Sequence, residues 1–213
     1  MEDRRITKTK RNIKSTLTDL LQEMPFEKIT VAEICRRGEI SRITFYTHYE
    51  DKYALVEEIV SDHVQEAYDK YHELQNINNP QNDGIIGYKN LLEAILHLYH
   101  DNSAFFMHTT SRENPYLFSA YFDRMYLSVD DYLRRHTCLK PRFPYRQTAA
   151  LICNGLFGVI NSSIVDGMSG VEVCRIARDM YAVLLESRIF EYTEGKKGAR
   201  HGAADTKSHS CHV

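Results

Sequence analysis

Residues 40–52, ISRITFYTHYEDK, contain many side chains that can form hydrogen bonds or carry positive charge. An arginine, a lysine, a histidine and several hydroxyl groups stand there with few apolar residues, which is not typical of a buried helix. An ordinary solvated helix face would contain more Glu and Lys. The composition predicts a surface that binds a polar partner, and the candidate contact residues are Ser41, Arg42, Thr44, Tyr46, Thr47, His48 and Lys52.

Two short helices are expected to position these side chains. Thr30 begins the pattern of a capping box and predicts a helix over residues 30–37. Gly38 is expected to end this helix in a left-handed turn, and Ser41 is expected to cap a second helix over residues 41–48. Two such helices, joined by a turn of three or four residues, have the dimensions of a helix-turn-helix unit.

The second helix of such a unit lies in the major groove of DNA, with its N-terminal residues at base edges. Ile40 and Phe45 are expected to face inward, which leaves Arg42 and Tyr46 on the outer face. An arginine can bind guanine, while hydroxyl groups and lysine suit phosphate oxygens. The alternatives are an ordinary surface arginine at position 42 and a core tyrosine at position 46. The pattern favours a recognition helix.

The rest of the chain also has helical periodicity. Apolar residues at spacings of three and four predict a first helix over residues 8–24, and residues 1–14 contain six basic residues against two acidic ones. No segment shows the sustained alternation of a β-strand. The fold class is therefore expected to be all-α, with later helices at about 51–74, 85–101, 102–111, 115–136, 146–166 and 170–191.

The composition restricts the possible classes of protein. The 213 residues include five widely spaced cysteines without a CxxC pair, which indicates a cytoplasmic protein with reduced thiols and no zinc site. The longest nearly apolar run, residues 149–160, has 12 residues, whereas a membrane span needs roughly 20. No membrane segment is expected. Residues 194–213 are small and polar and predict a disordered tail.

Residues 30–55 read TVAEICRRGEISRITFYTHYEDKYAL. This segment resembles the TetR family of transcriptional regulators, whose members read close to T-V-x-x-I-a-x-x-A-G-V-S-r-x-T-F-Y-x-H-Y-x-x-K-x-x-L. The chain departs from that pattern in the turn, where Gly38 and Glu39 replace the usual Ala and Gly. The resemblance implies a three-helix DNA-binding domain, expected over residues 1–50. It also implies a helical effector-binding and dimerisation domain, expected over residues 51–193.

The resemblance implies roles for individual residues as well. Those expected at DNA are Thr30, Ser41, Arg42, Thr44, Tyr46, Thr47, His48 and Lys52. Of these, Arg42 and Thr44 would approach bases, and Lys52 would bind a phosphate. The basic side chains Lys8, Lys10 and Arg11 would reach the neighbouring backbone or the minor groove.

Two further sites are expected in the helical domain. Large apolar side chains are expected to line a cavity for a small apolar or aromatic effector, and the candidates are Phe105, Phe106, Tyr121, Phe122 and Met125. The family pairs its last two helices with those of a second subunit, and small residues allow a close approach. The candidates for this dimer interface are Leu151, Gly155, Gly158 and Ser162. The alternative for both sets is packing within one subunit.

These expectations describe a homodimeric regulator that binds a DNA operator with twofold symmetry. We expect a repressor that a small-molecule effector releases. An alternative is a DNA-binding regulator whose helical domain binds a protein partner. A helical enzyme is a remote alternative, because no nucleophile–base pair, phosphate-binding loop or metal-ligand set stands out. We expect no catalytic residues, no cofactor and no metal.

Overall fold

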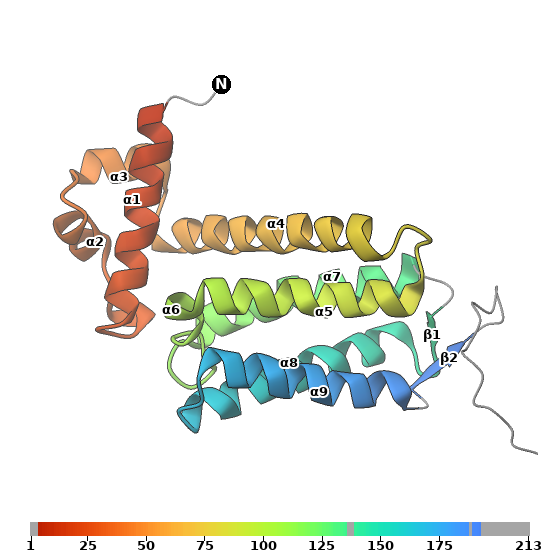
Figure 1. Cartoon of the computed structure of the whole chain (residues 1–213). Coiled ribbons are helices and arrows are strands. Elements are labelled where there is room, and N and C mark those ends of the chain that lie inside the picture. The colour runs from red at the N-terminus through yellow and green to blue at the C-terminus, as the bar shows by residue number, and fades with distance from the viewer. Residues whose placement is uncertain (1–3, 136–138, 188, 193–213) are drawn as a thin grey trace, which may run out of the picture.

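The computed structural model describes residues 4–135, 139–187 and 189–192, and these residues are almost entirely helical (Figure 1). The all-α fold class is confirmed. The helices are α1 (Arg4–Leu21), a short 3₁₀ turn (Phe26–Lys28), α2 (Val31–Arg37), α3 (Arg42–His48), α4 (Lys52–Asn78), α5 (Gly84–Asp101), α6 (Ser103–Phe106), α7 (Pro115–Arg135), α8 (Tyr145–Val165) and α9 (Gly170–Glu186). The tail predicted over residues 194–213 lies outside the described residues.

Side-chain caps fix where the short N-terminal helices begin. The Thr30 hydroxyl accepts a hydrogen bond from the Glu33 amide at 3.2 Å and starts α2. The Ser41 hydroxyl accepts from the Thr44 amide at 3.0 Å and starts α3. Each cap satisfies an amide that the first turn of a helix leaves without a partner. Both helices therefore begin where the sequence predicts.

The long helix α4 connects the two parts of the molecule (Figure 1). Its first residues lie against α1 to α3, and the rest of the helix packs on α5 and α7. Helices α8 and α9 form the layer on the far side of α5 and α7. A movement of α4 would therefore change the packing at both ends of the molecule.

The hydrophobic core of the N-terminal unit continues into the second half of the chain. It contains buried residues of α1, α2 and α3, such as Leu17 and Phe45, and the first turns of α4. It also contains Phe105, Leu117 and Tyr121, which come from α6 and α7. A separate core lies between α5, α7, α8 and α9. Because the first core is shared, the helix-turn-helix unit and the helical bundle are packed together.

The sequence did not predict the short antiparallel pair β1 (Leu139–Pro141) and β2 (Phe190–Tyr192). The strands lie at the end of the bundle opposite the helix-turn-helix unit (Figure 1). Leu139 pairs with Tyr192, and Pro141 pairs with Phe190. Strands of three residues are too short to show alternation, and they pair because α7 and α9 end near each other.

One described helix, Tyr145–Val165, is long and apolar enough to cross a membrane by length and composition alone, with a mean hydropathy of 1.6. A third of that window, 33%, is buried inside the protein. This helix is α8, and it packs on α7 and α9 in the bundle. A single helix of this kind is common in the cores of helical proteins, so it is weak evidence for a membrane span.

Candidate functional site

Helix α3 presents one face to solvent. Arg42, Tyr46 and Thr47 are exposed on it, and Tyr46 keeps 56% of its surface. Ile43 is 82% exposed, which is unusual for an isoleucine. Phe45 is fully buried on the opposite side, as predicted. In the described chain this face has no covering element, so its arginine, hydroxyl and methyl groups are available to a partner.

Some of the predicted contact residues also make contacts within the helix-turn-helix unit. The Ser41 hydroxyl lies 2.8 Å from the Thr44 hydroxyl, and the Thr47 hydroxyl donates to the Ile43 carbonyl at 2.8 Å. Thr30 is exposed at the start of α2. His48 is half-buried, and its ring lies beside Tyr49. Ile43 is a further exposed residue of this face. Its exposure now makes it a candidate for apolar contact with a thymine methyl group.

The turn between α2 and α3 differs from the prediction at Gly38. Gly38 has an ordinary φ of −79°, whereas Glu39 takes the left-handed conformation with φ of 52°. Gly38 is needed for another reason: a Cβ there would lie 3.0 Å from the Thr16 hydroxyl and 3.1 Å from the Ile34 carbonyl. The small residue allows α1 to approach, and the strain of the turn falls on Glu39.

Lys52 also differs from its predicted role at a phosphate. Its ammonium donates to the backbone carbonyls of Phe26 at 2.8 Å, Glu27 at 3.2 Å and Ile29 at 2.8 Å. The same ammonium lies 4.4 Å from the centre of the Phe26 ring. An ammonium has three donors, and all three are engaged here. Lys52 therefore ties the start of α4 to the segment between α1 and α2.

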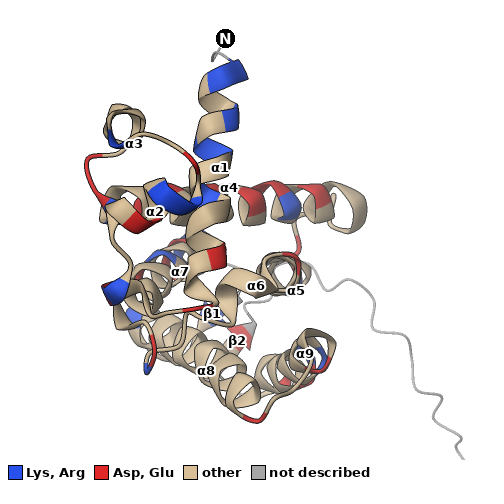
Figure 2. Cartoon of the chain, turned by 90° about the vertical axis from the view of Figure 1, so that its left-hand side faces the viewer, with Lys and Arg blue, Asp and Glu red and all other residues tan. Residues whose placement is uncertain are grey.

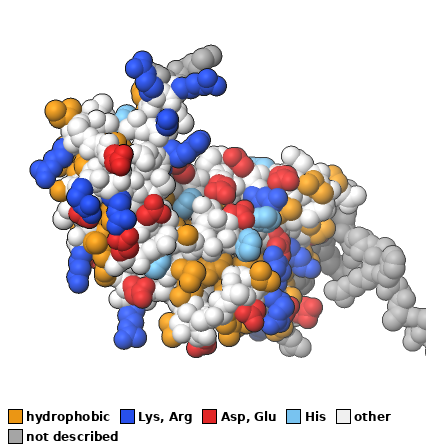
Figure 3. All heavy atoms as spheres, turned by 60° about the vertical axis from the view of Figure 1, so that its left-hand side comes forward, with side chains coloured by type: hydrophobic (Ala, Val, Ile, Leu, Met, Phe, Trp, Pro, Cys, Tyr) orange, Lys and Arg blue, Asp and Glu red, His pale blue; other side chains and the backbone are white. Residues whose placement is uncertain are grey.

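The basic end of α1 divides into two groups. Lys8 and Arg11 are exposed; Figure 2 shows basic residues along the N-terminal end of this helix, and Figure 3 shows basic side chains there. Lys10 instead pairs with Glu58 of α4 at 3.1 Å, and its contact with DNA stays a prediction. In both Figure 1 and Figure 2, the start of α1 and helix α3 lie at the same end of the molecule.

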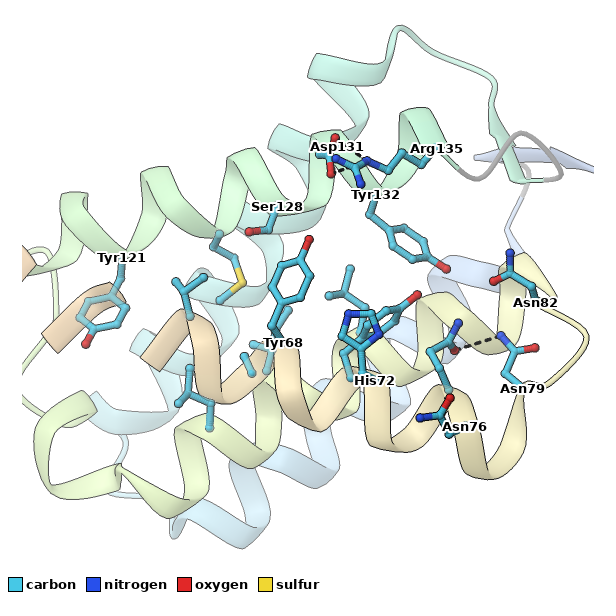
Figure 4. A pocket seen from close by; sticks show the side chains of 18 of the residues that line it. Tyr68, His72, Asn76, Asn79, Asn82, Tyr121, Ser128, Asp131, Tyr132 and Arg135 are labelled. Carbon is cyan, nitrogen blue, oxygen red and sulfur yellow. Dashed lines mark hydrogen bonds and ion pairs between the residues drawn. The ribbon is translucent and has the colours of Figure 1, made fainter. Parts of the chain in front are cut away.

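The helical domain contains a cavity of about 500 Å³ between α4, α5 and α7 (Figure 4). Tyr121 and Met125, two of the predicted pocket residues, line it. Phe105, Phe106 and Phe122 are not among its lining residues in the described chain. Phe105 and Phe106 pack in the shared core, and Phe122 stacks between other rings of α7. The C-terminal half of α4 supplies much of the wall.

Tyr121 connects this cavity with the shared core. It lines the cavity, is 3% exposed, and has a hydroxyl 2.5 Å from the Nδ1 atom of His63. Burial lowers the pKa of His63 to about 4, so the ring is neutral, and its Nδ1 atom shares a hydrogen bond with the tyrosine hydroxyl. A second connection is Asn114, 2% exposed, whose side chain accepts from the Phe26 amide at 2.6 Å and donates to the His108 carbonyl. Two points of the bundle are thus bonded to elements near the helix-turn-helix unit.

The four residues predicted at a dimer interface lie together on one face of α8. Leu151, Gly155, Gly158 and Ser162 are all exposed. A Cβ at Gly158 would meet no atom within 4 Å, so this part of α8 is open in the single chain. Exposed apolar side chains of α8 and α9 share the surface, among them Val165, Val171, Met180 and Val183.

Among the described residues, no group of three or more His, Cys, Asp or Glu side chains is placed to hold a metal ion.

The fold and the exposed recognition helix together define a helix-turn-helix protein with a helical domain attached. Residues 15–59 match the family described as bacterial regulatory proteins, tetR family. A curated relative, the uncharacterized HTH-type transcriptional regulator YxbF of Bacillus subtilis, is 34% identical over 50 residues, which cover 24% of this chain. The match spans 13% of the length of that relative.

Solved structures share the fold along most of the chain. A putative TetR-family regulator from Syntrophomonas wolfei has a TM-score of 0.69 at 12% identity, covering 85% of this chain and 96% of its own. SmeT, the repressor of a Stenotrophomonas maltophilia multidrug efflux pump, has a TM-score of 0.59 at 17% identity, covering 87% and 91%. A complex of SmeT with triclosan has the same TM-score. Residues 15–59 thus match the tetR family of bacterial regulatory proteins, and the described chain as a whole shares its fold with solved TetR-family structures.

Proposed function

We propose that this protein is a sequence-specific DNA-binding transcriptional regulator. The observation that carries the proposal is the open face of α3, where Arg42, Ile43, Tyr46 and Thr47 are exposed. A recognition helix reads bases through such side chains: arginine binds guanine and apolar groups touch thymine methyl groups. Lys8 and Arg11 are exposed at the same end of the molecule and suit phosphate oxygens.

We further propose a homodimer formed through α8 and α9. Exposed apolar residues on adjacent helices, such as Val165 and Val183, favour an interface because burying them in a partner removes apolar surface from water. The small residues Gly155 and Gly158 allow a second helix to come close. A twofold dimer would present two α3 helices to an operator of matching symmetry.

The cavity supports regulation by a small molecule. Its volume of about 500 Å³ lies within the range of sites for drug-sized ligands. SmeT, a relative in fold, is a repressor with a structure in complex with triclosan, so we expect this protein to be a repressor released by an effector. The alternative, a helical domain that binds a protein partner, would be favoured by a filled core.

The contacts of Tyr121 and Asn114 suggest how the cavity would affect DNA binding. A ligand that displaces Tyr121 would disturb its hydrogen bond to His63 on α4. Asn114 joins the loop before α7 to the Phe26 amide, and Lys52 joins the same segment to α4. A ligand changes DNA affinity only if it binds the DNA-bound and the free arrangements of the protein with different affinities.

The test is selection of bound fragments from genomic DNA, followed by measurement of the affinity for the selected site. A single site with twofold symmetry is the expected result. Arg42→Ala should weaken binding by about 1–3 kcal/mol and relax the base preference if the contact with guanine is bidentate. If Arg42→Ala changed neither affinity nor preference, α3 would not be the recognition helix.

A further inference from the structure

The cavity between α4, α5 and α7 has two chemically different parts (Figure 4). One part is apolar and is lined by Val64, Ala67, Leu91, Ile95, Leu98 and Met125. Tyrosines of α4 and α7, among them Tyr68 and Tyr132, stand along it. The other part lies towards the C-terminal end of α4, where the carboxamides of Gln75, Asn76, Asn79 and Asn82 gather. A ligand that fills both parts needs an apolar body and a polar end, and an aromatic body suits the tyrosine rings along the wall.

Apart from His72, the described wall offers no unpaired acidic or basic side chain to an ionic ligand. Among the described lining residues, Asp131 is the only carboxylate, and Arg135 is the only Lys or Arg. These two side chains pair with each other at 2.8 Å, one turn apart on α7 (Figure 4). A charged ligand would leave water without gaining an unpaired opposite charge, which is unfavourable. The pair therefore selects against ions of both signs.

A hydrogen-bond network fixes the orientation of Gln75. Its Oε1 atom accepts from Asn79 at 3.0 Å and from Asn90 at 2.6 Å. Asn90 is 3% exposed, and its amide also donates to Asn78 at 2.7 Å. Asn79 is held in turn, since its Oδ1 accepts from the Asp83 amide at 2.7 Å. Because its oxygen already accepts twice, Gln75 cannot turn its amide around without breaking both bonds.

What remains of the Gln75 side chain for a ligand is a donor. In the part of the chain that the structure describes, the Gln75 Nε2 group donates to no protein atom, whereas its oxygen is engaged. An amide group held in this way would complement a hydrogen-bond acceptor on a ligand. A ligand without an acceptor at this position should bind more weakly than one with an acceptor, because the Gln75 amide would lose its hydrogen bonds to water and gain none.

We propose that the cavity takes an uncharged, planar aromatic molecule whose polar end is a hydrogen-bond acceptor, such as a carbonyl oxygen, bound by Gln75 Nε2. The proposal rests on the proposed role of the cavity as the effector site and adds the chemical class of the effector. Gln75 selects the acceptor, and the ion pair of Asp131 with Arg135 excludes charge.

Three fluorescent naphthalene probes test the class in the full-length protein. Prodan is uncharged and has a carbonyl acceptor; anilinonaphthalene is uncharged and has none; anilinonaphthalene sulfonate has the same rings as the second probe and adds a negative charge. We expect Prodan to bind most tightly, and the sulfonate to bind about tenfold or more weakly than anilinonaphthalene. Equal or tighter binding of the sulfonate would overturn the proposal, as would failure of all three to bind.

Variants assign the selectivity to residues. Gln75→Glu keeps an acceptor for Asn79 and Asn90 but removes the free donor, so Prodan should bind about threefold to tenfold more weakly, while anilinonaphthalene is unaffected. Asp131→Asn leaves Arg135 without its partner and should tighten binding of the sulfonate several-fold. The matched control is Asp130→Asn, which breaks the neighbouring pair with Arg134, outside the cavity lining. If Gln75→Glu bound Prodan as tightly as the unaltered protein does, the role of Gln75 would be refuted.

A further pair of variants locates the probes. Ser128 lines the cavity, so Ser128→Trp should block it and abolish binding, whereas Ser119→Trp adds the same ring to an exposed position of α7. Binding that survives Ser128→Trp would place the probes elsewhere and overturn the proposal. Operator affinity, measured with each probe, separates this proposal from the regulatory one. If the probes bind as expected but none alters operator affinity, the ligand class stands and the effector role fails.

Discussion

Replacing Lys52 by Met removes an ammonium that donates to three backbone carbonyls, those of Phe26, Glu27 and Ile29. A hydrogen bond to a charged group contributes about 1.5–3 kcal/mol. Lys52 is only half-buried and the freed carbonyls can regain water, so we expect a total loss of about 2–4 kcal/mol in the free energy of unfolding. For a chain of this size, the melting temperature should fall by roughly 4–16 °C.

The same variant separates a structural role from a phosphate contact. A lost phosphate contact would reduce the slope of log affinity against log salt concentration by about 0.9. We expect this slope to stay unchanged in Lys52→Met, while operator affinity falls at every salt concentration because the start of α4 is less firmly held. Lys28→Met is the matched control, since it removes the same charge from an exposed position of the same segment. An unchanged melting temperature with a flatter salt slope would refute the reasoning.

Other predictions follow from single residues. Glu39→Gly should raise the free energy of unfolding by about 1 kcal/mol in urea titrations, because Glu39 has a φ of 52°, which glycine adopts without strain. Gly38→Ala should lower the free energy of unfolding, since a Cβ would lie 3.0 Å from the Thr16 hydroxyl. Burial lowers the pKa of His63 from 6.5 to about 4, so unfolded chains bind a proton that the folded protein does not. Stability from this group is fully present above about pH 6.5 and should fall by about 2 kcal/mol by about pH 5, a loss that His63→Gln should remove. Gly158→Leu should leave the monomer folded, because a Cβ meets nothing within 4 Å, but weaken the dimer in sedimentation experiments; an unchanged dimer would exclude this face of α8.

The sequence by itself determined the helix-turn-helix unit. The caps at Thr30 and Ser41 act on amides three residues away, so the starts of α2 and α3 depend on neighbours in the chain. The inward position of Phe45 follows from helical periodicity in the same way. These are local interactions, and the family pattern over residues 30–55 contains them all. The helices of the bundle could be predicted for the same reason.

Tertiary structure decided what the distant side chains do. Lys52 fits a phosphate-binding pattern, but the carbonyls that surround it come from residues 26 to 29, which only the packing of α4 against that segment brings near. Phe122 and Tyr121 are adjacent aromatics in sequence, yet neighbouring positions on a helix point about 100° apart, so only Tyr121 reaches the cavity. The carboxamides at the polar end of the cavity depend on α4 lying beside α5, where buried Asn90 orients Gln75. Contacts between residues far apart in sequence are set by how the helices pack. The periodicity of one helix does not indicate which helix packs against it.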